Sequence, residues 1–338
     1  MPELPEVETV VRGLRNRVVG DVIEDVWLSG RRQPLKSPPE EIAAVLEGAR
    51  IAGVRRMGKH IVIDLVIGRP EDRVIGRQED RVIGRSGDRV IEKRDRGRKL
   101  KAGSNSPDKR IARSPDAAAG SRSPDHQITG SPDAAITRSP DSQFIVHLGM
   151  TGRLTVGPPG APPAKHTHLV ARLKSGRELR FVDPRMFGKL AVVREPFETA
   201  GTEPLDIGFE LFAGLFRKRK TPIKSALLNQ KLLRGIGNIY ADESLARAGI
   251  RPRRRAATLT RADLHRLFQS VQQVLNQAIA AGGSSVSDYV DAAGEPGFFQ
   301  FQHRVYGREG EPCLSCGAPI KRVVIAGRSS HYCPKCQT

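Results

Sequence analysis

Four cysteines near the end of the chain constrain its fold more than any other feature. They form two Cys-x2-Cys pairs within the last 26 residues, with sixteen residues between the pairs, at Cys313, Cys316, Cys333 and Cys336. Two pairs at this separation match the ligand spacing of a tetrahedral four-thiolate zinc site. Because four thiolates leave no open coordination position, the metal should fold the segment rather than catalyse. We therefore predict one structural zinc ion.

The residues between the two cysteine pairs predict a β-hairpin. Residues 323–325 and 331–332 supply two short apolar or aromatic runs, and the Ala-Gly-Arg-Ser sequence between them suits a turn that carries Arg328. His331 is a further candidate ligand, but four thiolates already suffice for zinc.

The other end of the chain predicts an unusual nucleophile. It begins Met1-Pro2-Glu3-Leu4-Pro5-Glu6. Removal of Met1 would leave Pro2 with a secondary amine whose pKa lies near the α-amino range of about 8. Such an amine attacks carbonyl-like carbons and forms an iminium. Glu3 is then a candidate general acid or base, and Glu6 lies one helical turn from Pro2.

An amphipathic helix should hold this terminus rigidly. Val7, Val10, Val11, Leu14 and Val18 follow the spacing of one buried helix face. The alternative is an ordinary helix start, since proline and glutamate are both common in the first turn. On this stretch alone the ordinary interpretation is favoured by about two to one, because short motifs are weak signals.

The charge of the chain indicates a polyanionic partner. With 56 Lys and Arg against 37 Asp and Glu, the 338 residues carry a formal net charge of +19. Nucleic acid is the most economical partner, bound with a strong dependence on salt. An anionic membrane surface is the rival, but no basic amphipathic helix with a large apolar face stands out. Without a transmembrane stretch or signal peptide, we expect a cytoplasmic, nucleoid-associated protein and no membrane partner.

The composition changes abruptly over residues 68–143. A seven-residue unit, Glu-Asp-Arg-Val-Ile-Gly-Arg, recurs eight residues later, and Ser-Pro-Asp then occurs five times. Repeats rich in Arg, Asp, Ser, Pro and Gly, with almost no aromatic residues, bury too little apolar surface to order themselves. We expect a largely disordered insertion.

Segments on both sides of this insertion suit contact with DNA. Lys59 and His60 precede a predicted strand over residues 61–66, and basic residues at the mouth of a strand suit phosphate. A solvated charge run explains them about as well. Later turns display Met150, Arg185 and Phe187, side chains suited to wedge a base stack open. Taken singly, Met150 or Phe187 would more often be core, by about three to one.

Residues 206–283 have a helical pattern. Thr260 is a plausible N-cap for the best-defined helix, and shorter helices are expected over residues 222–233 and 239–248. The glycine-flanked turn between the two shorter helices ends at Asn238, and it would present backbone N–H groups to phosphate. Residues 284–302 should form an irregular loop.

These motifs, in this order, resemble the formamidopyrimidine-DNA glycosylase family of bacterial base-excision repair enzymes. The resemblance implies an α+β multidomain fold. An N-terminal catalytic β-sandwich with flanking helices would occupy residues 1–205, including the insertion at 68–143. A helix-two-turn-helix domain would occupy residues 206–295, and a zinc ribbon, a β-hairpin, residues 296–338. DNA would lie in a basic cleft between the two lobes.

The resemblance also assigns roles to single residues. Pro2 and Glu3 would be catalytic, Lys59 would contact the DNA backbone near the lesion, and Arg328 would clamp its phosphate. The other expected DNA contacts are His147, Met150, Arg185, Phe187, Asn238 and, as a weaker candidate, Lys224. The family often carries a second basic residue where this chain has Met186, so one phosphate contact is in doubt.

The activity that the resemblance implies is that of a bifunctional glycosylase and AP lyase. Its substrate would be duplex DNA containing oxidised purines, chiefly 8-oxoguanine and formamidopyrimidines, or abasic sites. Pro2 would attack C1′ while Glu3 assists ring opening through O4′, and β- and δ-elimination would leave a single-nucleotide gap. We expect a monomer.

Two alternatives remain at this level. An endonuclease VIII-like glycosylase of oxidised pyrimidines shares Pro2, Glu3 and the helix-two-turn-helix, but Leu4 and the set of Met150, Arg185 and Phe187 argue against it. A non-catalytic DNA-damage-binding protein would keep the basic cleft and the zinc ribbon without needing the N-terminal nucleophile.

Overall fold

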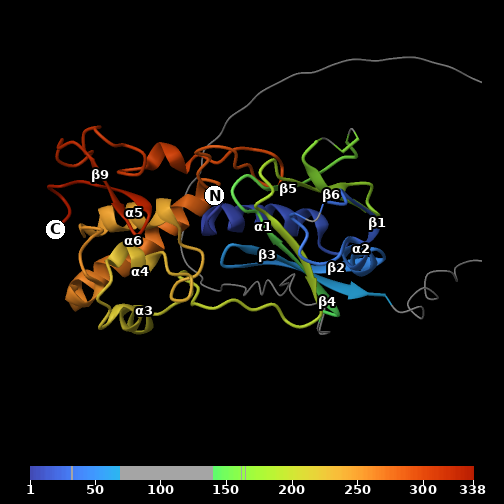
Figure 1. Ribbon diagram of the computed structural model, residues 1–338, viewed down its shortest axis with the longest axis horizontal. Helices are drawn as coiled ribbons and strands as arrows, with labels where there is room; N and C mark the ends of the chain where they lie inside the picture. Colours follow the sequence, from blue (N-terminus) through green and yellow to red (C-terminus); the bar gives the residue numbers. More distant parts are fainter. Residues whose placement is uncertain (32, 69–139, 161, 164) are drawn as a thin grey trace, which may run out of the picture. The chain divides into compact units, whose positions relative to one another are not determined.

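The computed structural model describes residues 1–31, 33–68, 140–160, 162–163 and 165–338 (Figure 1). The described residues all belong to one compact unit. The expected disordered insertion at 68–143 therefore lies almost entirely outside the described residues. At its far edge, strand β4 (Ser142–His147) begins inside the predicted boundary.

Helix α1 (Leu4–Val18) fixes the N-terminus against the core. Glu3 is its N-cap, and the Glu3 backbone N–H donates to Glu6 Oε2 at 2.8 Å in a capping box. All five predicted apolar positions are fully buried in the core of the β-sandwich: Val7, Val10, Val11, Leu14 and Val18. The amphipathic helix predicted from the sequence is confirmed.

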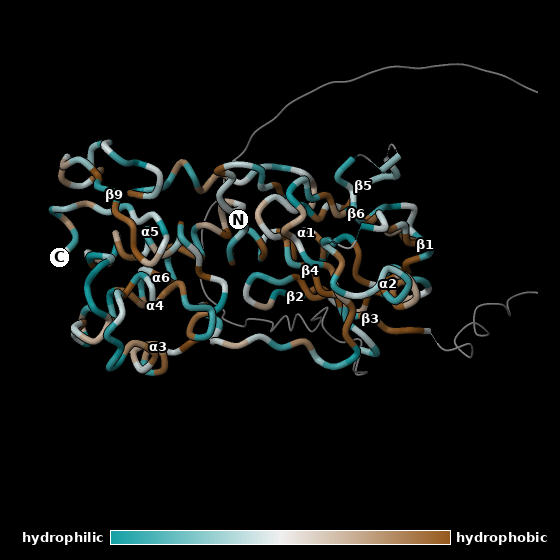
Figure 2. Tube along the Cα trace, viewed as in Figure 1, coloured by the Kyte–Doolittle hydropathy of each residue, from teal (hydrophilic) through white to brown (hydrophobic). Residues whose placement is uncertain are grey.

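Two four-stranded antiparallel sheets form the N-terminal sandwich, and buried apolar residues of both belong to one core cluster. Hydrophobic stretches run along their strands (Figure 2). One sheet has the order β2 (Ala49–Met57), β3 (His60–Ile67), β4 and β8 (Lys189–Val193). The other has the order β1 (Ile23–Leu28), β6 (Thr167–Leu173), β7 (Glu178–Val182) and β5 (Arg153–Gly157). Helix α2 (Pro39–Leu46) contacts strands β1 and β8.

The pairing of β3 with β4 places two of the predicted DNA contacts, Lys59 and His147, at one end of the sheet. His60 pairs with His147 at that end, and Leu65 pairs with Ser142 at the other. The segment between the two strands leaves from the second end, where Asp141 N donates to the Leu65 carbonyl at 2.9 Å. The chain that separates the strands in sequence therefore leaves from the end opposite Lys59.

The second half of this unit is helical and has its own core. It contains α3 (Phe209–Phe216), α4 (Ile223–Leu227), α5 (Asn238–Ala248) and α6 (Arg261–Ala280), with 3-10 turns at Ala256–Thr258 and Phe299–Gln302. Thr260 caps α6 as predicted, accepting a hydrogen bond from Asp263 N. The helix predicted over residues 222–233 was too long, because α4 ends at Leu227.

A hairpin closes the chain. Strand β9 (Lys321–Ile325) pairs with β10 (Arg328–Tyr332) through a two-residue turn, in which Ala326 has φ 48° and Gly327 has φ 73°. Two positive φ values are typical of the type I′ turn that matches the twist of a hairpin. Arg328 is thus the first residue of β10 and is exposed. In the described part of the chain, no helix is long and apolar enough to cross a membrane.

Candidate functional site

Pro2 lies at the wall of a small pocket between the N-terminus and the loop that follows α6. Pro2 itself is buried, whereas Met1 is 52% exposed and accessible for removal. Until Met1 is removed, the Pro2 nitrogen is a peptide nitrogen and has no nucleophilic lone pair. The pocket is lined by Met1, Pro2, Glu6, Met150, Ile239, Ser284, Val286, Ser287 and Tyr289.

Glu3 is buried at the N-terminus of helix α5. Its Oε1 accepts from Ile239 N at 3.2 Å and its Oε2 from Tyr240 N at 3.4 Å, and the side chain is 4% exposed. Burial raises the pKa of Glu3 to about 7, against the opposing effect of the Lys59 charge and the two N–H donors. A carboxyl group with this pKa can both donate and accept a proton near neutral pH.

Gly235 and Gly237 allow the Glu3 side chain to approach the N-terminus of helix α5 closely. A Cβ on Gly237 would lie 2.3 Å from Glu3 Oε1. Gly235 has φ +95°, and a Cβ there would clash with the Leu4 side chain. The sequence suggested that this glycine-flanked turn serves phosphate binding. In the structure its glycines first of all admit the N-terminus of α1 against α5.

Glu6 fixes the N-terminus through a hydrogen-bond network that the sequence did not reveal. Its carboxylate accepts from the Tyr240 hydroxyl, from Ser284 N at 2.8 Å and from Glu3 N at 2.8 Å. Tyr289 donates to the Glu6 carbonyl at 3.2 Å. Burial raises the pKa of Glu6 and of Tyr240. No spacing in the sequence links residues separated by more than 230 positions, so only the fold identifies these partners.

The charges of Glu3, Glu6 and Arg328 all act on the Lys59 ammonium. Lys59 is 9% exposed, and burial lowers its pKa, while Glu3 and Glu6 raise it and Arg328 lowers it further. A buried ammonium, two buried carboxyl groups and an exposed guanidinium therefore act on one another electrostatically. Such a cluster suits proton transfer next to a bound phosphate.

Lys224 lies elsewhere than the sequence suggested. Its side chain is fully buried, with Nζ 2.6 Å from Asp242 Oδ1 and donating to the Ser329 carbonyl at 2.6 Å. Asp242 also accepts from His331 N at 2.9 Å. A buried ammonium needs such partners to offset its lost hydration. In this structure Lys224 is not available to phosphate, and instead ties helices α4 and α5 to the hairpin residue that follows Arg328.

The three predicted wedge residues stand on two adjoining turns. Met150 is 38% exposed and Phe187 is 52% exposed. The Arg185 guanidinium lies 4.9 Å from the centre of the Phe187 ring. A Cβ on Gly149 would lie 2.5 Å from the Phe187 carbonyl carbon, so the two turns touch at a position only glycine can occupy.

Buried Asp183 holds these turns in place. It accepts from Thr151 Oγ1 at 2.6 Å and from Gly188 N at 2.7 Å. Residue Met186, where a second basic side chain was expected, has φ 55°. Its sulfur lies 3.9 Å from Arg31 Nη1, so a cation from another segment stands next to this position.

His147 is the last residue of strand β4, and Asn238 lies at the start of helix α5. Burial lowers the pKa of His147 to about 4, and its Nδ1 accepts from Gly149 N at 3.1 Å. The ring is therefore neutral and carries its hydrogen on Nε2, where it can act as a donor. Asn238 is the first residue of α5 and is half-buried. Both remain predicted DNA contacts.

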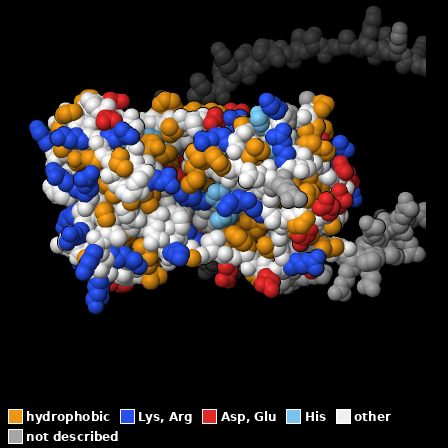
Figure 3. Space-filling model, in the orientation of Figure 1, with side chains coloured by type: hydrophobic (Ala, Val, Ile, Leu, Met, Phe, Trp, Pro, Cys, Tyr) orange, Lys and Arg blue, Asp and Glu red, His pale blue; other side chains and the backbone are white. Residues whose placement is uncertain are grey.

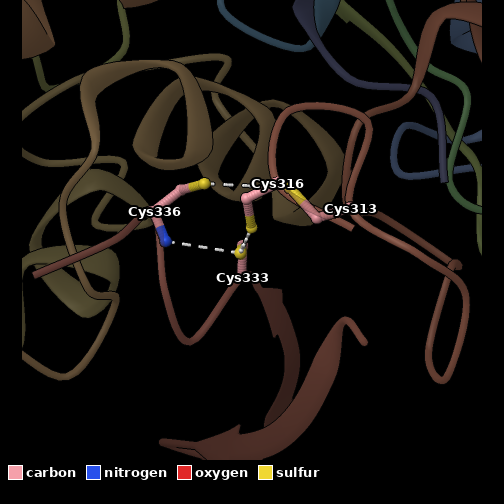
Figure 4. Close-up of side chains that lie close together, drawn as sticks. All are labelled: Cys313, Cys316, Cys333 and Cys336. Atoms are coloured by element: carbon pink, nitrogen blue, oxygen red, sulfur yellow. Dashed lines mark hydrogen bonds between the residues drawn. The ribbon is translucent and has the colours of Figure 1, made fainter. Parts of the chain in front are cut away.

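The four cysteines converge as the spacing predicted (Figure 4). Their sulfur atoms all lie within 4.8 Å of one another, with 3.5 Å between those of Cys316 and Cys333 and 3.9 Å between those of Cys313 and Cys336. Tetrahedral Zn–S bonds of about 2.3 Å require sulfur atoms about 3.8 Å apart. The four thiolates thus fit one zinc ion without rearrangement of the backbone.

Comparison with known proteins agrees with this geometry along the chain. Residues 1–190 match the model of the formamidopyrimidine-DNA glycosylase N-terminal domain. Residues 200–290 match that of the formamidopyrimidine-DNA glycosylase H2TH domain, and residues 310–338 match that of the zinc finger found in FPG and IleRS. The chain is 39% identical to a formamidopyrimidine-DNA glycosylase of Solibacter usitatus, covering 100% of this chain and 99% of that protein. It is 38% identical to one of Gluconobacter oxydans, covering 100% of both.

Solved structures of the Lactococcus lactis FPG protein are similar over the full length. A mutant of that protein in complex with a Fapy-dG containing DNA is 28% identical, with a TM-score of 0.72 and 100% of both chains covered. A complex of that protein with an abasic site containing DNA is 28% identical, with a TM-score of 0.72 and 99% of both chains covered. A complex of the wild-type protein with an oxidized pyrimidine containing DNA is 28% identical, with a TM-score of 0.71 and 100% of both chains covered.

The fold, the buried N-terminal cluster and the four-cysteine segment define a base-excision repair DNA glycosylase with a zinc finger. The chain belongs to the formamidopyrimidine-DNA glycosylase family. The resemblance seen in the sequence, the α+β multidomain fold and the single structural zinc site are thereby confirmed.

Proposed function

We propose that this chain removes oxidised purines from duplex DNA and then cleaves the abasic strand, with Pro2 as the nucleophile. The observation that carries the proposal is the placement of Pro2 at a pocket beside the buried pair Glu3 and Glu6, whose charges interact with that of Lys59. An ordinary helix start would not need two carboxyl groups buried below its first residue, because burial of charge is costly.

The chemistry follows from the groups at this pocket. Once Met1 is removed, the Pro2 nitrogen attacks C1′ of the damaged nucleotide, and the protonated Glu3 donates to O4′ as the sugar ring opens. The C1′–base bond breaks, and the base leaves with the electron pair of that bond and a proton. The iminium between Pro2 and C1′ then acidifies C2′, so that β-elimination releases the 3′ phosphate and δ-elimination the 5′ phosphate.

The remaining site residues would hold the DNA in the conformation that the reaction needs. Lys59 and Arg328 would bind the phosphates next to the lesion. The exposed wedge of Met150, Arg185 and Phe187 would fill the space left by the extruded nucleotide. Residues of a single chain line the pocket, and we propose a monomer.

Borohydride trapping tests the assignment. The protein is incubated with duplexes that carry 8-oxoguanine opposite cytosine, and the covalent adduct is mapped by mass spectrometry. We expect the adduct on Pro2, whereas Glu3→Gln should abolish base excision and leave DNA binding within a few-fold. An adduct on Lys59, or full activity of protein that retains Met1, would contradict the assignment.

A second substrate class has a specific observation in its favour. The related Lactococcus lactis FPG protein has been solved with an oxidized pyrimidine containing DNA. The same trapping reaction on duplexes with an oxidised pyrimidine therefore accompanies the first. Faster trapping on the pyrimidine would favour the endonuclease VIII-like alternative, and failure to trap on either duplex would favour a non-catalytic damage-binding protein.

A further inference from the structure

Two short basic segments lie next to each other on the helical half of the protein. Residues 217–220 are Arg-Lys-Arg-Lys and residues 251–255 are Arg-Pro-Arg-Arg-Arg, with no acidic residue in either. An antiparallel bridge joins Pro222 to Arg255, and Ala257 N donates to the Arg219 carbonyl at 2.8 Å. We define the basic strip as the exposed side chains Arg217, Lys218, Arg219, Lys220, Arg253 and Arg255.

The charges of the basic strip are not paired at ion-pair distance within the described part of the protein, although the Arg217 charge also acts on Glu210. The nearby acids are already bonded to other cations: Asp263 to Arg254 at 2.7 Å and Glu210 to Arg261. None of the six strip residues forms an ion pair with another described residue. Six like charges on one surface repel one another, so the strip gains stability when an anion binds.

Lys218 occupies a backbone conformation that lysine rarely adopts. It follows Arg217, the C-cap of α3, and has φ 62°, in the left-handed region that favours glycine at this position of a helix end. Its side chain makes no hydrogen bond to another described residue that would offset this strain. A cation is thus present where the backbone alone would favour glycine, which points to a role for the charge.

The basic strip adjoins the hairpin that presents Arg328. Arg253 Nη2 donates to the carbonyl of Val324, which pairs with Ser329 across the hairpin. Beside the strip, Arg251 is fixed to the zinc segment by its bonds to the carbonyls of Gln337 at 2.8 Å and Pro334 at 2.9 Å. Lys and Arg side chains also gather over the region of α3 and α4 on the face seen in Figure 3.

We propose that the basic strip binds the phosphate backbone of the DNA flank on one side of the lesion, beyond the nucleotides held at the active site. Charge complementarity selects a polyanion, and continuity with the Arg328 hairpin selects the same duplex rather than a separate ligand. The strip would set affinity and salt dependence, not the rate of chemistry. This inference rests on the proposed function, because it takes lesion-containing DNA as the substrate.

Three strip residues without a side-chain hydrogen bond in the described structure form the test variant: R217Q/K220Q/R255Q. The matched control K36Q/R50Q/K174Q removes the same charge from exposed positions on the β-sandwich. Binding to a 30-base-pair duplex with a central abasic analogue is measured by fluorescence anisotropy over a range of salt. The strip variant should lower the salt slope by about 0.9 for each phosphate that is no longer neutralised, and weaken binding roughly 10- to 100-fold at about 0.15 M salt. The control variant should change the salt slope and the affinity by only a small fraction of these amounts.

A second variant separates charge from folding. Lys218→Gly removes a cation and relieves the left-handed strain, so it should unfold at the same or a higher temperature than wild type while lowering the salt slope by about 0.9. Duplexes extended on only one side of the lesion locate the contact. Extension on one side should strengthen binding by wild type, and the strip variant should not show this gain.

The outcomes also distinguish this inference from the function on which it depends. Single-turnover excision by both triple variants at saturating enzyme should stay within about twofold of wild type. Equal salt slopes for the strip and control variants, or equal gains from extension on either side, would overturn the strip assignment while excision remains. A wild-type protein that neither excises nor prefers the abasic duplex would instead overturn the proposed function.

Discussion

At the scale of single residues, the raised pKa of Glu3 makes a prediction about stability. A carboxyl group whose pKa is about 7 in the folded protein and 4.5 when unfolded binds more protons in the folded state between these values. Its contribution to stability is therefore fully present below about pH 4.5 and is lost as the pH rises through 7. The difference between these two pKa values corresponds to roughly 3 kcal/mol across this window.

Glu3→Gln removes the titration and isolates the effect. Urea unfolding of both proteins between pH 5 and 8 should show the stability of wild type falling relative to the variant as the pH rises, with no further change above about pH 8. The glutamine also alters the bonds to Ile239 and Tyr240, which adds a constant offset but no pH dependence. A difference that stays constant from pH 5 to 8 would show that Glu3 is not protonated in the folded state.

The individual site residues differ in how far the sequence could predict them. The cysteines follow from local spacing, because the two members of a Cys-x2-Cys pair are close whatever the fold. Pro2 and Glu3 needed the resemblance as well, because their stretch alone favours an ordinary helix start. The partners of Glu6 do not, since Tyr240 and Ser284 reach it only after α5 and the loop after α6 have packed on α1. Lys224 was misjudged for a related reason, because a lysine gives no sign in the sequence that its ammonium will be buried against an aspartate.

At the scale of elements, the buried pair of Lys224 and Asp242 positions the hairpin that carries Arg328. Lys224→Met would leave Asp242 buried without its cation, which costs roughly 3 to 5 kcal/mol of stability or displaces the hairpin. We expect single-turnover excision to fall at least tenfold. The zinc content should stay at one per chain, because the four thiolates do not depend on this pair.

Combining Lys224→Met with Asp242→Asn separates the internal role from a DNA contact. Removing both charges together should recover a large part of the lost excision and stability, as expected for a coupled buried pair. Were Lys224 instead a phosphate contact, the single variant would lower the salt slope of DNA binding by about 0.9 without destabilising the protein, and the second change would recover nothing.

Elements were predictable where the pattern is local. The α1 periodicity, the Thr260 cap of α6 and the strand predicted over residues 61–66 all gave the observed structure. The helix expected to continue to residue 233 ends at Leu227 because the chain there pairs with a distant segment. Thr202 bridges Leu233, Thr202 N donates to the Leu232 carbonyl at 2.9 Å, and Arg234 N donates to the Thr202 carbonyl at 3.1 Å. These tertiary bonds replace the helical ones, and helix propensity alone could not anticipate them.

At the scale of the whole molecule, the pairing of β3 with β4 predicts that residues 69–139 can be removed. The described residues on either side of this segment meet at the end of the sheet farthest from Lys59, where Ile67 N donates to Asp141 Oδ2 at 2.9 Å. A short turn can therefore join the two strands without altering their register. Seven residues at about 3.3 Å each place this edge roughly 20 Å from the end of the sheet that bears Lys59.

Replacing residues 69–139 with a four-residue turn should thus leave single-turnover excision within about twofold of wild type. The segment carries more Lys and Arg than Asp and Glu, so its removal should weaken salt-sensitive binding to undamaged DNA. Excision is measured at saturating enzyme and binding by titration with an undamaged duplex. A large fall in the excision rate, with zinc content and unfolding temperature intact, would show that the segment takes part in the active site, because neither the sheet nor the metal centre would then explain the fall.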